Sequence, residues 1–281
     1  MSKDYKELAR LARIKVLTMI YKAQTSHVAS NFSVLDIATV LYENLKEEDE
    51  VVWSKGWASA SIYYFLAKQG KIPVEDLDKF GKEIDGKIPY LGLAETSVPG
   101  VLVNGGSMGH GLGIAVGMAY GKKLAKEKGV VYCVLSDGEM NEGSVWEAVM
   151  LANHHKLNNL VVLIDANKWQ AMGKTKDVID LEPIEDRWMG MGWKVQRIDG
   201  HNYEQIEEAL TTDFTEDNIT EFPKPDYVFN QPIVDESYKY KPMVIICDTI
   251  KGKGVSFFED HLLYHYKHVS DEDFKLAMQE L

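Results

Sequence analysis

The sequence predicts an α/β fold, a doubly wound and mostly parallel sheet with helices on both of its faces. Continuous apolar runs bounded by turns, which are typical of buried parallel strands, occupy residues 130–137, 160–167, 193–200 and 242–249. Helical patterns separate these runs, and this alternation favours a sheet covered on both faces. A chain of 281 residues is long enough for a large core. We expect one domain over residues 1–281.

Apolar spacing and capping residues predict the helices in order. An amphipathic helix is expected over residues 3–24, and a second helix after Ser33, which we interpret as its N-cap. Residues 71–98 contain two prolines and predict short helix and loop. The remaining apolar or helical segments are 57–66, 105–125, 143–155, 201–210 and a C-terminal helix opened by Ser270.

One connection is unusually long. Residues 212–241 separate a predicted helix from a predicted strand, where connections of about 2–6 residues are usual. The segment is acidic at first, then rich in aromatic residues and prolines. It predicts either a surface excursion with its own hairpin or a loop that binds a partner or covers a site.

Charge and cysteine content narrow the class of protein. There are 31 Lys and Arg against 43 Asp and Glu, a formal net charge of −12, which argues against a general nucleic-acid or anionic-membrane surface. Cys133 and Cys247 lie in apolar runs and are expected to be free core thiols. The start of the chain lacks a secretory signal pattern and no apolar stretch is long enough to span a bilayer, so we expect a cytoplasmic protein.

Two predicted strand ends carry side chains suited to a metal ion. Asp137 and Asn167 follow successive apolar runs, one strand-helix-strand unit apart. Adjacent parallel strands would place both at one edge of the sheet, where ligands of such folds bind. A carboxylate and an amide carbonyl suit Mg²⁺ completed by phosphate oxygens and water, although an Asp-Gly pair after a strand is also a common turn. The Gly-rich stretch 105–113 fits neither a Walker nor a dinucleotide motif, and serves either helix packing or close approach of a ligand.

Together these segments resemble the transketolase family, and specifically its thiamine-diphosphate-binding N-terminal part. The resemblance covers residues 5–270 apart from the 212–241 break, and rests on these segments in this order: SHVASNFSVLDIATVLY, SKGWASASIYYFLA, PGVLVNGGSMGHGLGIAVGMAYGKKL, SDGEMNEGSVWEAVMLANHHKLNNLVVLIDANKWQ, DGHNYEQIEEAL and TIKGKGVSFFEDHLLYHYK.

The resemblance implies a cofactor site. The family's metal motif matches the side chains of Asp137 and Asn167 and the carbonyl of Trp169 as ligands of Mg²⁺, with Ca²⁺ or Mn²⁺ as substitutes. Ser136 replaces the motif's first glycine. Further positions match the family's contacts to thiamine diphosphate: Gly106, Ser107, Met108, Gly109, Gly138, Glu139, Asn167, Lys251 and Trp57.

The resemblance also implies catalytic residues and a partner. His27 and His265 match histidines near the substrate, and Glu142 matches a glutamate in a hydrogen-bonded network at the subunit interface. In the family, the glutamate that activates the cofactor lies in a second domain, and the segment after residue 270 is too short to encode that domain. The simplest interpretation is the N-terminal subunit of a split transketolase, assembled with a second chain as α2β2 and acting on sugars or sugar phosphates.

Two departures from the family pattern keep other functions open. Trp57 stands where the family usually has a histidine at the diphosphate, and no histidine precedes Pro99, where members usually have one that recognises donor hydroxyls. Loss of such donors changes which substrate is accepted. The alternatives are a decarboxylating carboligase of the deoxyxylulose-phosphate synthase type and a non-catalytic module that retains the fold. His201 is interpreted only as a turn residue after Asp199-Gly200.

Overall fold

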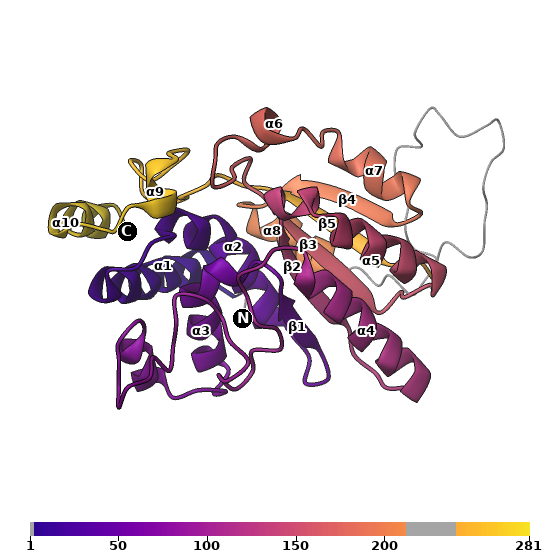
Figure 1. Ribbon diagram of the computed structural model, residues 1–281, viewed down its shortest axis with the longest axis horizontal. Coiled ribbons are helices and arrows are strands. Elements are labelled where there is room, and N and C mark those ends of the chain that lie inside the picture. Colours follow the sequence, from indigo (N-terminus) through magenta and orange to yellow (C-terminus); the bar gives the residue numbers. More distant parts are fainter. Residues whose placement is uncertain (1–2, 212–239) are drawn as a thin grey trace.

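A computed structural model describes residues 3–211 and 240–281. Its centre is a five-stranded, all-parallel sheet in the order β1-β2-β3-β5-β4 (Figure 1). The strands are β1 (Glu50–Trp53), β2 (Val131–Ser136), β3 (Leu160–Ala166), β4 (Lys194–Asp199) and β5 (Met243–Asp248). The predicted fold class is confirmed.

Helices cover both faces of the sheet, as the alternating pattern predicts. On one face the core includes residues of α1 (Tyr5–Ala23), α2 (Val28–Asn44), α3 (Ser59–Lys68), α8 (Tyr203–Thr211) and α10 (Asp271–Glu280). On the other face lie α4 (His110–Ala125), α5 (Gly143–His154) and α7 (Ile184–Gly190). The short helices α6 (Thr175–Val178) and α9 (Leu263–Tyr266) belong to connections at the sheet edge (Figure 1). Successive side chains of each strand pack into opposite cores, so both are apolar.

The four predicted strands are β2 to β5, while β1 was not predicted. It is only four residues long and begins with Glu50 at an edge of the sheet, so it lacks the long apolar run of a central strand. Cys133 and Cys247 are buried free thiols in β2 and β5, as expected, and burial raises the pKa of each.

The helix ends show one wrong prediction and one confirmed. Ser33 is not an N-cap, because α2 already begins at Val28, after His27 with a left-handed φ of 71°. Ser33 lies inside α2, and its buried hydroxyl bonds to Asp165 instead. At the C-terminal helix, Ser270 forms a capping box with Asp273, as the sequence predicts.

The register of β2 and β3 places the two strand ends side by side. Ser136 pairs with Asp165, so Asp137 and Asn167 emerge at the same carboxyl edge, as predicted. No helix within residues 3–211 and 240–281 is long and apolar enough to cross a membrane. Residues 212–239, which hold nearly all of the long connection, lie outside the described residues.

Candidate functional site

The site begins at the end of β2 with a buried carboxylate. Asp137 is 2% exposed, and its Oδ1 accepts a bond from its neighbour's backbone, Gly138 N, at 2.9 Å. Its Oδ2 accepts from the backbone N–H of Lys168 at 2.8 Å and from the hydroxyl of Thr175 at 2.9 Å. The structure gives this carboxylate no ion pair among the residues it describes, and burial raises its pKa to about 6.

The chain after β3 folds back to make those contacts. Trp169 pairs with Lys174 in an antiparallel bridge, and Gln170 N–H donates to Gly173 O at 2.8 Å. The same turn joins Thr175 N–H to Lys168 O at 2.9 Å. This tight hairpin supplies the two donors to Asp137 Oδ2, Lys168 N–H and the Thr175 hydroxyl. It starts at Asn167, whose Oδ1 accepts from Trp169 N–H at 3.1 Å.

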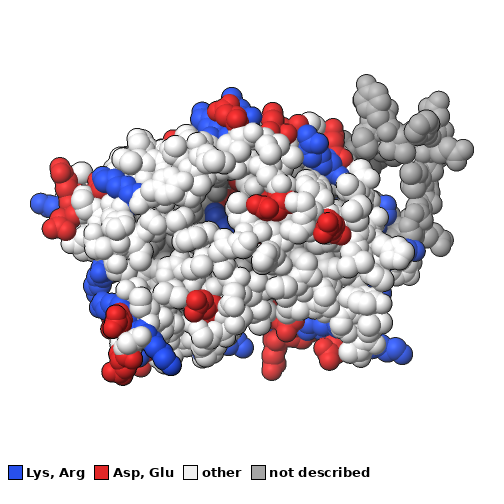
Figure 2. All heavy atoms as spheres, viewed as in Figure 1, with Lys and Arg blue, Asp and Glu red and all other residues white. Residues whose placement is uncertain are grey.

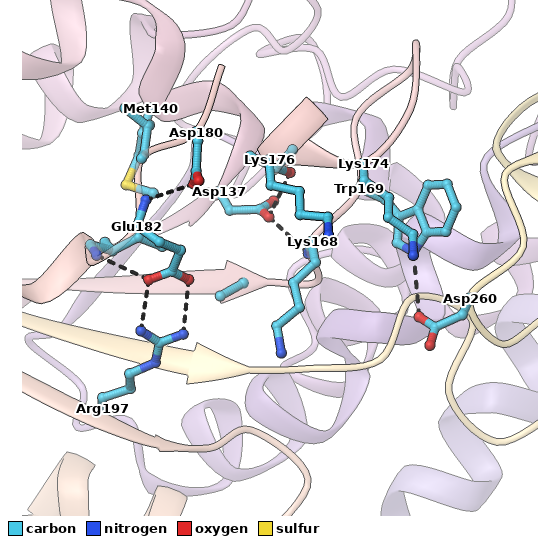
Figure 3. Close-up of a pocket in the computed structure, with 14 residues that line it drawn as sticks. Asp137, Met140, Lys168, Trp169, Lys174, Lys176, Asp180, Glu182, Arg197 and Asp260 are labelled. Atoms are coloured by element: carbon cyan, nitrogen blue, oxygen red, sulfur yellow. Dashed lines mark hydrogen bonds and ion pairs between the residues drawn. The ribbon is translucent and has the colours of Figure 1, made fainter. Parts of the chain in front are cut away.

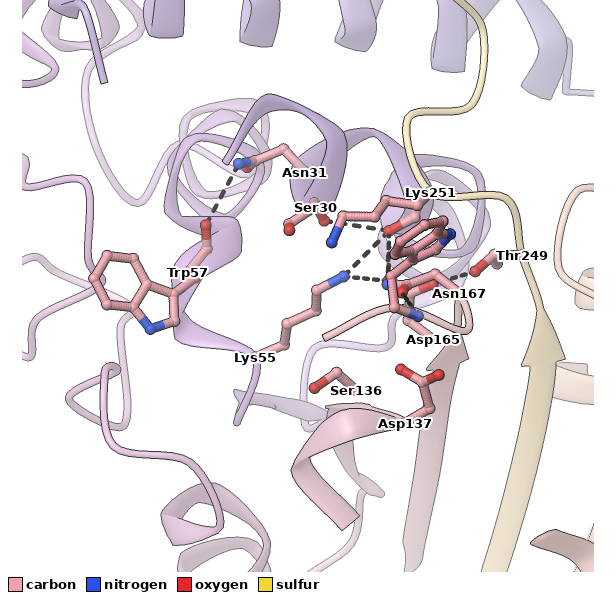
Figure 4. Close-up of polar contacts among 12 residues, drawn as sticks. Ser30, Asn31, Lys55, Trp57, Ser136, Asp137, Asp165, Asn167, Thr249 and Lys251 are labelled. Atoms are coloured by element: carbon pink, nitrogen blue, oxygen red, sulfur yellow. Dashed lines mark hydrogen bonds and ion pairs between the residues drawn. The ribbon is translucent and has the colours of Figure 1, made fainter. Parts of the chain in front are cut away.

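The end of β3 holds a second buried carboxylate, which is already paired. Asp165 is fully buried and accepts from the Lys55 ammonium, the hydroxyls of Ser33 (2.6 Å) and Thr249, and the Asn167 amide (3.3 Å) (Figure 4). Burial alone would raise its pKa, but Lys55 and the hydroxyl donors lower it below the usual value. Neither Lys55 nor Asp165 was predicted as a site residue, although both lie in segments that carry the family resemblance.

A lysine and two imidazoles stand across from these carboxylates. Lys251 is 1% exposed, and its Nζ lies 2.7 Å from His265 Nδ1. The ring of His27 meets that of His265 edge-on at 4.7 Å between centroids. The backbone N–H of His27 donates to the backbone carbonyl of His265 at 3.1 Å. The amino groups of Lys55 and Lys251 lie between Trp57 on one side and Asp137 and Asn167 on the other (Figure 4).

Burial governs the protonation of this cluster. It lowers the pKa of Lys251 to about 8, with the nearby Lys55 charge acting in the same direction. It also lowers the pKa of His27 to about 4 and of His265 to about 3, helped by the charge of Lys251. Both imidazoles are therefore neutral at pH 7, each able to donate one hydrogen bond and accept one.

Trp57 lies at the open side of the cluster. Its indole stacks on the His27 ring at 4.5 Å between centroids, with 15° between the planes. Its N–H donates to Gly106 O at 3.3 Å, and the side chain remains 41% exposed. The indole N–H that could replace a histidine contact is thus used by the Gly-rich loop.

The Gly-rich loop packs tightly against the Ser54–Gly56 segment. A Cβ on Gly56 would lie 2.3 Å from Gly105 Cα, so neither position has room for a side chain. Glu139 is buried, and its carboxylate accepts from the Ser54 hydroxyl and from Gly109 N–H at 2.8 Å. Packing therefore explains Gly105, while Gly106, Ser107 and Met108 continue the loop and Met108 stays exposed.

A cavity of about 400 Å³ opens beside Asp137 (Figure 3). Its lining includes Asp137 and Trp169 from the site, and the Arg197–Glu182 ion pair on its far side. The Trp169 indole N–H donates to Asp260 Oδ1 at 3.4 Å, and both residues line the cavity. In the space-filling view, Figure 2 shows a hollow near the centre of this face, with Lys or Arg atoms at its bottom.

The donor set at the strand ends fits a divalent cation. Asp137 Oδ1 and Asn167 Oδ1 each accept one hydrogen bond and keep a second lone pair, and the Trp169 carbonyl follows two residues after Asn167. Hard oxygen donors of this kind, few in number, suit Mg²⁺ that also binds phosphate oxygens. Within residues 3–211 and 240–281 no three His, Cys, Asp or Glu side chains gather as a metal cluster, so these mixed donors are the cation candidate.

The transketolase thiamine-diphosphate-binding domain model matches residues 5–220. The chain belongs to the transketolase family. It is 34% identical to a protein of Phocaeicola vulgatus named as a subunit of apulose-4-phosphate transketolase, over 96% of this chain and 90% of that protein. It is 32% identical to the 6-deoxy-6-sulfo-D-fructose transketolase subunit SqwG of a Clostridium species, over 99% and 96%.

Solved transketolase structures share the fold. The transketolase of Campylobacter jejuni superposes with a TM-score of 0.83 at 29% identity, covering 100% of this chain and 43% of that one. This transketolase-family chain thus spans less than half of such an enzyme, yet nearly all of the proteins named as subunits.

Most predicted site residues converge at one sheet edge. Asp137, Asn167, Lys251, His27 and His265 share it through the contacts above. Glu142 stands apart from them as the N-cap of α5, partly exposed beside Gly109. Their roles toward a cofactor or substrate stay predictions.

Proposed function

We propose that this chain is the diphosphate-binding subunit of a split transketolase. It transfers a two-carbon ketol unit from a ketose or ketose phosphate to an aldose, using thiamine diphosphate. The observation that carries the proposal is the Asp137 carboxylate, buried without an ion pair among the described residues, beside Asn167 and facing Lys251, in a member of the transketolase family.

The cofactor's diphosphate has matched groups on this chain. Asp137, Asn167 and the Trp169 carbonyl hold Mg²⁺, or Ca²⁺ or Mn²⁺ in its place, and Lys251 adds a positive charge nearby. The backbone of Gly138, Glu139 and residues 106–109 lines the space around the diphosphate. When bound, thiamine diphosphate supplies the nucleophilic carbon that carries the two-carbon unit, and the protein orients it and excludes water.

The two neutral imidazoles serve the sugar. His265 Nδ1 contacts Lys251 Nζ, and His27 Nδ1 bonds to the Ser26 hydroxyl. Nε2 of each neutral ring is therefore the atom that bonds to a sugar hydroxyl, without placing a charge beside the reacting carbon. Trp57 replaces a further polar group by an aromatic face stacked on His27. We infer that this chain selects its donor with fewer hydrogen bonds at that end than a typical transketolase.

A second subunit completes the enzyme. The chain spans 43% of the Campylobacter jejuni transketolase but 90% and 96% of relatives named as subunits, which supports a partner carrying the remaining domains in an α2β2 assembly. The outer side of α4 exposes Gly113, Gly117 and Gly121, and α5 exposes Met150 and Leu151. Figure 2 shows few charged side chains over these helices, as expected of a face that a partner covers. Glu142 lies at the start of the same face.

The test is to purify the tagged chain with whatever co-purifies and to assay the complex. We expect a stoichiometric second chain, binding of thiamine diphosphate that requires Mg²⁺, and ketol transfer from ketose phosphates. Carbon dioxide release from pyruvate would instead identify a decarboxylating carboligase. A complex that binds no thiamine diphosphate with Mg²⁺ would leave only the non-catalytic module.

A further inference from the structure

A buried carboxylate on α2, outside the site, bonds to side chains from α1, from α8 and from the turn before α8. Asp36 accepts two hydrogen bonds from the Arg13 guanidinium of α1, at 2.8 and 2.7 Å. It also accepts from the Tyr203 hydroxyl at 2.8 Å and faces His201 Nδ1 at 2.8 Å. The side chains of Arg13 and His201 are largely buried, and although burial alone would raise the pKa of Asp36, His201 and Arg13 hold it well below the usual range.

Two of these partners reach the loop that carries Lys251. His201 Nε2 accepts from Ile250 N–H at 2.8 Å, immediately before the lysine. Arg13 Nε donates to Lys253 O at 2.9 Å, two residues after it. Between them, Gly252 N–H donates to Ala29 O of α2 at 3.0 Å. The backbone on both sides of Lys251 is therefore tied to α1 and α2.

The contacts of His201 define one arrangement of its ring. Because Nε2 accepts a backbone N–H, that nitrogen carries no proton, and the proton sits on Nδ1, where it is donated to Asp36. The ring therefore bridges Asp36 and the backbone of Ile250, and fixes the distance between them. A residue that served only the turn would need neither contact.

We propose that Arg13, Asp36 and His201 are positioning residues that hold the Ile250–Lys253 loop and thereby set Lys251 Nζ against His265 and toward the site. The step to cofactor binding rests on the proposed function, in which Lys251 faces the diphosphate. The holding of the loop does not, because it concerns only this chain's own contacts. A role limited to packing would stabilise the fold without affecting the placement of Lys251.

The two ring contacts can be separated by isosteric amides. In His201→Asn the amide takes the place of Nδ1 and keeps a donor for Asp36, but ends short of Ile250. In His201→Gln the amide oxygen reaches the place of Nε2 and still accepts from Ile250. The same substitution at an exposed histidine, His268→Asn, is the matched control.

The experiment measures amide hydrogen exchange and Mg²⁺-dependent thiamine diphosphate affinity on the chain co-purified with its partner. In His201→Asn we expect exchange at Ile250 to rise at least about tenfold and affinity to fall about 10-fold, in the range for outer-shell partners. His268→Asn should stay within about threefold of wild type, and His201→Gln, which keeps the Ile250 contact but loses Asp36, should lose clearly less than His201→Asn. Combining His201→Asn with Lys251→Met should weaken binding no further than Lys251→Met alone, because the histidine acts through the lysine.

Additive losses in the double variant, or unchanged exchange at Ile250 in His201→Asn, would overturn the proposal. Equal losses in both His201 variants with a lower denaturation midpoint would do the same, since they indicate a packing role. If the wild-type complex binds no thiamine diphosphate, the proposed function fails, while the exchange measurement still decides whether His201 holds the loop.

Discussion

The ends of β2 and β3 carry two buried aspartates in opposite electrostatic situations. Asp165 on β3 is ion-paired with Lys55 and hydrogen-bonded by two hydroxyls and an amide, and its pKa is lowered. Asp137, after β2, accepts only neutral donors within the described residues, and burial raises its pKa to about 6. Both lie at one edge of the sheet, because Asp165 pairs with Ser136, the residue before Asp137.

This contrast shows which carboxylate is available. A buried carboxylate with a cationic partner serves the fold, because its charge is compensated within the chain. A buried carboxylate held only by neutral donors keeps an uncompensated negative charge, which a bound cation can neutralise. The residue type is the same at both positions, and the partner decides the role.

The largest effect is expected at the paired carboxylate. Asp165→Asn leaves the Lys55 ammonium buried without its counter-charge, so the free energy of unfolding should fall by about 3–5 kcal/mol. Urea denaturation measures it. Adding Lys55→Met to that variant should restore much of the loss. If the unfolding free energy of Asp165→Asn alone lies within about 1 kcal/mol of wild type, the two aspartates do not differ as proposed.

At Asp137, the carboxylate without an ion pair among the described residues, a substitution should leave the fold stable but abolish most cofactor binding. Asp137→Asn keeps acceptors for Lys168 N–H and Thr175, so the unfolding free energy should change by less than about 1.5 kcal/mol, the scale of one hydrogen bond. Calorimetric titration should show thiamine diphosphate affinity with Mg²⁺ reduced by more than about 100-fold, beyond the range of outer-shell changes. Retained Mg²⁺-dependent binding would contradict the metal assignment.

Lys251 should make the affinity for thiamine diphosphate depend on pH. Its pKa is lowered to about 8, and a bound diphosphate would raise it, so binding takes up a proton and weakens as pH rises. As the protonated fraction falls from one half to about a tenth, affinity should drop about fivefold between about pH 8 and pH 9. Titrations across this range measure the slope. Lys251→Met should lack it, and an equal slope in that variant would assign the pH dependence to another group.

The smallest effect is expected at Trp57. Trp57→Phe removes one N–H bond of 3.3 Å to Gly106 O at a half-exposed position and keeps an aromatic face for His27. Thiamine diphosphate affinity should change by less than about threefold, and a loss above about tenfold would instead place the indole against the cofactor, as the family histidine's position implies.

Local pattern predicted the long elements and the metal edge, and missed what depends on short or distant segments. The apolar runs of β2 to β5 predicted the sheet because most of their residues are apolar and buried, and every residue of β3 is buried. The four residues of β1 carry too little pattern. The prediction of Ser33 as a cap was wrong, since its hydroxyl is satisfied by Asp165, a residue 132 positions away.

The fold class and the placement of Asp137 and Asn167 at one edge of the sheet follow from the order of residues alone, because strand-helix-strand spacing and apolar periodicity are local properties of the chain. Packing in three dimensions was needed to show that Lys55 neutralises Asp165, 110 residues on, and that His201 joins Asp36, 165 residues away, to the Lys251 loop. Those partners are chosen by how helices pack on the sheet, and a buried charge or ring nitrogen takes its role from whichever group that packing brings within hydrogen-bond distance.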